Sequence, residues 1–172
     1  MSLLRHFDRR PRSPRTLKWV TWPVAAALVA AFPVATWWVV GDLSTVPASA
    51  RPDFAFRPFT FSHGIILAAG IGSVSLTVLT LTWLTWATVG RRFDARWWTV
   101  IVPLLAAGFI AGAGWRVMTA GVIGANIGAG MVVVIGGPVV AALLGWALAR
   151  SIRLLRRSTG SGPQARLRVG AR

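Results

Sequence analysis

The sequence predicts an all-α membrane protein: four transmembrane helices in an up-down-up-down bundle, with both termini in the cytoplasm. The chain has 172 residues, of which 55% are hydrophobic and only 13% charged, too little charge for the surface of a water-soluble domain. Its apolar residues lie in four runs of about 20 residues or more, long enough to cross a hydrocarbon layer roughly 30 Å thick. These runs lack β-strand alternation, so helices are the structures that pair their backbone groups in lipid.

The chain divides into a basic tail, a membrane domain and a second basic tail. Residues 1–18 hold six Lys and Arg residues and little hydrophobicity, which indicates a disordered or loosely membrane-associated segment. Residues 150–172 form the second tail, with seven arginines, and its first part, Arg150 to Arg157 with Ile152, Leu154 and Leu155, either continues the last helix along the membrane surface or only sets the topology. Between them, residues 19–149 form the membrane domain, with spans at about 19–40, 63–89, 97–117 and 128–149 and an outer loop at 41–62.

The distribution of positive charge predicts the orientation. Sixteen of the 19 Lys and Arg residues fall in the two tails and in the turn at residues 90–96, on one side of the predicted membrane. The other side carries only Arg51, Arg57 and Arg116. Because Lys and Arg concentrate in cytoplasmic segments, we expect both termini in the cytoplasm and the chain in a bacterial cytoplasmic membrane.

The sequence allows a second topology, in which the first span is removed as part of a signal peptide. Residues 48–50 read Ala-Ser-Ala, which is similar to a signal-peptidase site, and cleavage there would leave three spans. The preceding apolar segment is longer than the 7–15 residues typical of a signal peptide, and the Ala-Ser-Ala lies well beyond its end. We therefore expect the first span to stay as an anchor.

Small residues at spacing four predict how the spans pack. Gly108 and Gly112 form one such pair in the third span, and Gly137, Ala141 and Gly145 form a row in the fourth. Residues four apart share a helix face, and small residues let a neighbouring helix approach closely in lipid. We expect packing within one chain, with homo-oligomer contact as the alternative.

Polar residues in the spans indicate either contacts between helices or a polar path through the membrane. Ser73, Thr77 and Thr80 share roughly one face of the second span. Their hydroxyls can bond to carbonyls of the preceding turn, so helix packing is the first interpretation and a polar path for a solute is the second. Asn126 lies in the Gly-rich passage at residues 121–130, where a flexible turn or a broken helix start is expected.

The outer loop carries an unusual density of aromatic residues. Phe54, Phe56, Phe59 and Phe61 lie within eight residues of each other. Such side chains either enter the lipid headgroup layer or bind a partner protein.

Arg116, at the outer end of the third span, has two expected roles. It either extends to lipid phosphates or pairs with Asp42 or Asp53. Only the ion pair would hold the outer loop to the helices.

No group of residues predicts catalysis, a cofactor or a metal. The chain has no cysteine and two histidines, and none of its four aspartates lies in a predicted span, which argues against ion-coupled transport. We therefore expect a non-enzymatic accessory or scaffold protein, with a small transport or channel component as the alternative. The expected partners are the lipid bilayer, anionic lipids at the basic tails and a membrane protein or a second copy of the chain. Nucleic acid is not expected, because the tails lack a folded domain and stacking residues.

Overall fold

The structure is a computed structural model that describes residues 15–43, 56–57, 59, 61–121 and 125–159. All regular elements in these ranges are helical, and four helical segments are long and apolar enough to cross a membrane, which confirms the coarse prediction. The elements are α1 (Arg15–Val40), α2 (His63–Val89), the short 3-10 helix η1 (Ala95–Trp97), α3 (Trp98–Met118), α4 (Ala125–Met131), the π-helical η2 (Val132–Gly136) and α5 (Gly137–Thr159).

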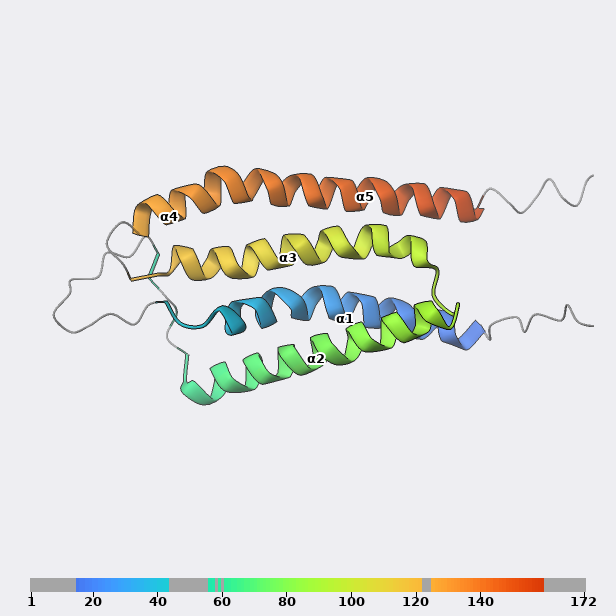
Figure 1. The fold of residues 1–172 in the computed structure, drawn as a ribbon, viewed down its shortest axis with the longest axis horizontal. Coiled ribbons are helices and arrows are strands. Elements are labelled where there is room, and N and C mark those ends of the chain that lie inside the picture. The colour runs from blue at the N-terminus through green and yellow to red at the C-terminus, as the bar shows by residue number, and fades with distance from the viewer. Residues whose placement is uncertain (1–14, 44–55, 58, 60, 122–124, 160–172) are drawn as a thin grey trace, which may run out of the picture.

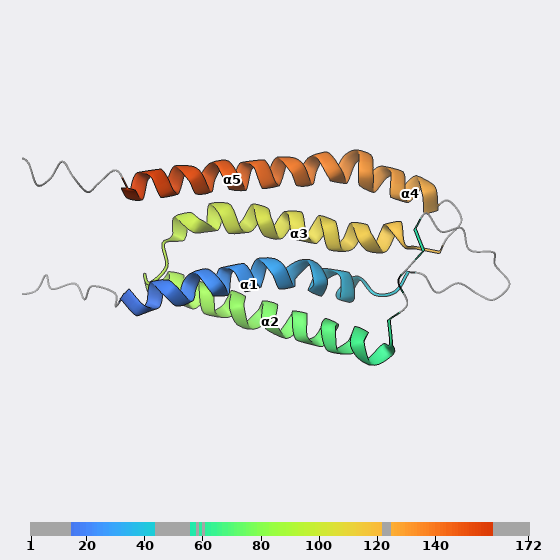
Figure 2. The same ribbon diagram turned by 180° about the vertical axis from the view of Figure 1, so that it is seen from behind.

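The four spans lie side by side in one layer, in the order α2, α1, α3, α5 (Figures 1 and 2). Helices that follow one another in the chain run in opposite directions, whereas α1 and α3, which lie side by side, run in the same direction (Figure 1). α1 therefore begins at the same end of the layer at which α5 ends. The expected bundle would surround a shared core, whereas among the described residues α2 makes no substantial contact with α5. Consequently the two central spans are 28% and 33% buried, and the edge spans only 11% and 6%.

The α1–α2 contact follows a heptad pattern. The buried residues of α2 recur at alternating intervals of three and four: Gly70, Ser73, Thr77, Thr80, Leu84 and Ala87. This spacing keeps one narrow face of a helix against a neighbour. Gly70 lies directly under the indole of Trp38 on α1, since a Cβ added at Gly70 would overlap the ring. The close approach of the two helices therefore depends on the absence of a side chain at Gly70.

The α1–α3 contact is close at Gly108 and Gly112, two of the three glycines of α3. A Cβ at Gly112 would lie 2.3 Å from the carbonyl oxygen of Pro33 and 3.1 Å from the Cβ of Thr36, and a Cβ at Gly108 would lie 3.3 Å from the Cδ of Pro33. Small residues at this spacing let helix backbones approach each other without intervening side chains. The backbone of α3 thus packs directly on the Pro33 turn of α1.

The fourth span is one helical rod from Ala125 to Thr159, longer than expected at both ends. It begins before residue 128, and the irregular part lies deeper, where the backbone N–H of Gly137 bonds to the carbonyl of Val132 in a π-type turn. Pro138, which follows, cannot donate the next α-helical bond. At its other end the rod continues ten residues past Ala149, because Arg150 to Arg157 extend the helix.

The connection from α2 to η1 is a tight turn with hydrogen bonds of the Schellman type. Arg91 has φ +53°, and the backbone N–H groups of Arg91 and Arg92 bond to the carbonyls of Thr88 (3.0 Å) and Ala87 (2.8 Å). Asp94 then caps η1 by accepting a bond from the backbone N–H of Arg96 at 2.9 Å. The turn therefore presents its arginines in a defined arrangement at what we call the basic end: the start of α1, the turn and the end of α5.

Candidate functional site

The buried guanidinium of Arg116 joins α3 to the end of α1 at the opposite, loop end of the layer. Its Nε donates to the carbonyl oxygen of Trp37 at 2.7 Å, and its plane lies 4.0 Å from the centre of the Trp37 ring. An Nη lies 3.6 Å from the carboxylate of Asp42. Of the two roles expected for Arg116, the ion pair with Asp42 is present in the structure, and only 11% of the arginine side chain is exposed.

Two backbone bonds attach the outer loop to the residues that end α3. The N–H of Phe56 donates to the carbonyl of Met118 at 3.3 Å, and the N–H of Gly121 donates to the carbonyl of Leu43 at 3.2 Å. The loop is therefore held at both of its described sides. Phe54, Asp53 and the residues 48–50 lie outside the described residues.

An aromatic patch, made of Phe59, Phe61 and Trp115, lies beside Arg116. The rings of Phe59 and Trp115 are parallel to within 5° with centroids 6.3 Å apart, and those of Phe59 and Phe61 are 6.2 Å apart. The patch borders a groove of about 350 Å³ that reaches Pro33 and Gly112. Phe59 is 71% exposed, so large apolar rings are held in place without being covered. Phe56 is also exposed but has no ring contact of this kind among the described residues.

Ser73, Thr77 and Thr80 are buried on the face of α2 that packs against α1. The hydroxyl of Ser73 donates to the carbonyl of Gly70 at 2.9 Å, and that of Thr80 donates to the carbonyl of Leu76 at 2.6 Å. Thr77 borders a groove of about 280 Å³ whose other lining is almost wholly apolar. Within the described part of the chain, the Thr77 hydroxyl is buried with no hydrogen-bond partner.

Of the other residues that the sequence singled out, some pack against a neighbouring helix and others are exposed. Asn126 is exposed in the first turn of α4, and the π-helical η2 begins later in the span, at Val132. Gly137, Ala141 and Gly145 are exposed on α5, and a Cβ at either glycine would meet nothing within 4 Å. This row has no neighbour within the described chain, whereas the pair on α3 packs against α1 as described above.

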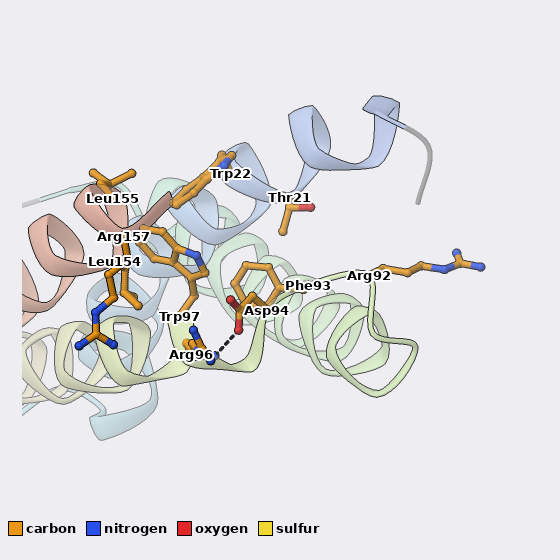
Figure 3. Close-up of a pocket in the computed structure, with 10 residues that line it drawn as sticks. All are labelled: Thr21, Trp22, Arg92, Phe93, Asp94, Arg96, Trp97, Leu154, Leu155 and Arg157. Atoms are coloured by element: carbon orange, nitrogen blue, oxygen red, sulfur yellow. Dashed lines mark hydrogen bonds between the residues drawn. The ribbon is translucent and has the colours of Figure 1, made fainter. Parts of the chain in front are cut away.

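Sequence reasoning missed a second cavity, of about 460 Å³, at the basic end (Figure 3). Its walls come from α1, from the α2–η1 turn and from the last turns of α5, which carry Leu154 and Arg157. The signal was present in the apolar residues spaced among the arginines after Ala149. A continued last helix was expected to lie along the membrane surface, and its approach to the α2–η1 turn was not predicted.

The described residues contain no group of three or more His, Cys, Asp or Glu side chains able to hold a metal ion. Comparisons with models of known protein families, with curated proteins and with solved structures found no match for this chain. The four apolar helices place the chain in the class of multi-pass membrane proteins. Its function is therefore argued from the geometry of its own surfaces.

Proposed function

We propose that this chain is a non-enzymatic accessory or scaffold subunit of the cytoplasmic membrane, which binds a membrane protein through the aromatic patch. We further propose that both termini are cytoplasmic, which places the patch on the outer side of the membrane. The proposal commits to a partner with an apolar surface at the level of the outer headgroups.

The observation that carries the proposal is the combination of exposure and fixed geometry in the patch. Phe59 is 71% exposed yet stacked on Trp115, and the adjacent Arg116 is hydrogen-bonded to Trp37. Aromatic side chains held in their bound geometry lose little conformational entropy on association, which favours binding. They are also the side chains most enriched among the residues that dominate binding energy at interfaces.

The single-layer arrangement is a second support. The edge helices α2 and α5 are mostly uncovered by this chain, and the grooves along the spans are open and apolar. A layer of this kind offers long helix faces to lipid or to a neighbouring protein. α1 lies between α2 and α3, so the proposed subunit needs α1 as a retained span.

Co-purification tests the proposal directly. The full chain, tagged at its C-terminus, is extracted in mild detergent from the membrane of its own organism, and the eluate is measured by intact mass spectrometry. We expect one protein at fixed ratio to the chain and a marked loss of it in Phe59→Ala. Leu79→Ala, which removes an equally exposed apolar side chain from α2, serves as the matched control.

Two results would contradict this function. The first is a chain that elutes alone or only with copies of itself. The second is a solute flux in vesicles that Thr77→Leu abolishes and Phe59→Ala leaves intact, which would support the transport alternative. The same spectrum gives the mass of the mature chain, and a chain that starts at Arg51 would contradict retention of α1.

A further inference from the structure

The cavity at the basic end and an apolar groove beside it share three residues. The basic cavity has a volume of about 460 Å³, and the groove between α1 and α3 has a volume of about 360 Å³. Trp22, Phe93 and Trp97 line both spaces, and the rings of Trp22 and Trp97 meet edge to face with centroids 4.4 Å apart (Figure 3). One molecule with a polar head and an apolar tail can therefore occupy both together.

The basic cavity has the charge of an anion site. Three arginines and one aspartate line it, and the Asp94 carboxylate already accepts a hydrogen bond from the backbone of Arg96. Arg92 points away from the cavity, with its guanidinium 4.7 Å from the Trp86 ring centre (Figure 3). Arg96 from η1 and Arg157 from α5 thus bring positive charge from two elements. Guanidinium groups form strong charge-assisted hydrogen bonds with phosphate oxygens.

The groove has the chemistry of an acyl-chain site. Beyond the shared aromatic residues its lining is entirely aliphatic, with small residues such as Ala26 and Ala30 on α1 facing Ile101 and Leu104 on α3. The eight residue steps from Trp22 to Ala30 correspond to about 12 Å along the helix, directed from the membrane surface toward its centre. An acyl chain in the groove would cover apolar surface that this chain leaves uncovered.

The expected depth of the site in the membrane suits both a headgroup in the basic cavity and an acyl chain in the groove. Tryptophans concentrate at the membrane–water interface, where lipid headgroups lie, and Trp22 and Trp97 stand at the junction of cavity and groove. The inner leaflet is rich in anionic lipids, and basic pockets between spans on that side suit their headgroups. The site differs from a general attraction of lipid to basic tails, because it is formed by defined positions of α1, the α2–η1 turn, η1 and the end of α5.

We propose that the basic cavity and the α1–α3 groove bind one anionic phospholipid. Its phosphate lies against Arg96 and Arg157, and one acyl chain lies along the groove. The lipid would join α1 to the end of α5, two helices that the layer otherwise separates by α3. The inference does not depend on the proposed accessory function, since it concerns the opposite end of the molecule.

Native mass spectrometry of the full chain in detergent tests the proposal. Phosphatidylglycerol and phosphatidylcholine with identical acyl chains are added at equal concentration. We expect one phosphatidylglycerol per chain to be retained in preference, and Arg96→Gln or Arg157→Gln to reduce that retention about tenfold, as loss of one hydrogen bond to a charged group implies. Arg96→Lys, which keeps the charge, should retain most of the preference.

Arg153→Gln is the matched control, because it makes the same change one helical turn before Arg157 without lining the cavity. An equal loss in Arg153→Gln would overturn the site in favour of general attraction to basic surface. Ala30→Phe fills the groove and should abolish phosphatidylglycerol retention, with Ala68→Phe on the exposed face of α2 as its control. Displacement of the lipid by millimolar inorganic phosphate would show a site for free phosphate. Retention unchanged in Ala30→Phe would show that no acyl chain lies in the groove, and either result would overturn the proposal.

Discussion

Arg116 and Trp37, 79 residues apart in sequence, are joined by a hydrogen bond of 2.7 Å and by a stacked contact of guanidinium and indole at 4.0 Å. The carbonyl of Trp37 lies in the last turn of α1, where carbonyl groups have no helical donor. Gly41 supplies one donor, its N–H bonding to the carbonyl of Trp38 at 3.1 Å. Arg116 supplies another from α3, so the end of one span is completed by the side chain of the next.

Replacing Arg116 by methionine should lower the free energy of unfolding by about 2 kcal/mol, the value of a hydrogen bond to a charged group. Asp42→Asn should lower the free energy of unfolding by less than about 1 kcal/mol, because Asp42 is 54% exposed and lies 3.6 Å from the guanidinium. Thermal unfolding of both variants in one detergent checks the order. A larger loss in Asp42→Asn would show that the ion pair, not the bond to Trp37, holds the loop end together.

Gly112→Ala should destabilise the α1–α3 contact by about 1–3 kcal/mol, the usual cost of adding atoms to a packed interface. The new Cβ would lie 2.3 Å from the carbonyl oxygen of Pro33, a backbone atom that can yield only if the helices separate. Gly145→Ala, the same change on α5 where a Cβ meets nothing within 4 Å, should be neutral or stabilising. Unfolding curves that rank the two variants in reverse would contradict the packing of α3 on Pro33.

Thr77→Val should leave the protein as stable as before or stabilise it by up to about 1 kcal/mol, since the substitution removes a buried hydroxyl that lacks a partner and keeps the shape of the side chain. Thr77→Ala, which opens a small cavity at the same place, should be less stable than Thr77→Val. Heat denaturation followed by circular dichroism measures both. Destabilisation by valine greater than by alanine would indicate a water or ion on the hydroxyl, as the transport alternative requires.

The lengths of the apolar runs were sufficient to predict four helices, because hydrocarbon imposes the same requirement on every spanning segment. The order of the helices could not be read in this way. Gly108 and Gly145 have the same spacing pattern in the sequence, yet one meets α1 and the other meets nothing within the described chain. Hydropathy does not distinguish a face toward lipid from a face toward a helix, since both are apolar.

The candidate sites were predictable only in part, for a related reason. Phe59 and Phe61 were visible as an aromatic cluster, but their stacking on Trp115 depends on where the loop returns to α3. The basic cavity was not predicted, because Arg157 was assigned to a tail and Arg96 to a turn. Continuation of the last helix past Ala149 was one expectation, but neither charge nor hydropathy showed that it brings Arg157 and Arg96 to one cavity.

The orientation of the layer is open to a direct chemical test, because the chain contains no cysteine. Ser62→Cys places one thiol at the loop end and Ala95→Cys places one at the basic end, both at exposed positions. If the distribution of arginines sets the topology, a membrane-impermeant maleimide should label Ser62→Cys in intact cells and Ala95→Cys only after the membrane is opened. Labelling of Ala95→Cys in intact cells would show that the layer has the opposite orientation in the membrane. It would move the aromatic patch to the cytoplasmic side and the lipid site to the outer leaflet, so this measurement decides in which compartment each partner is sought.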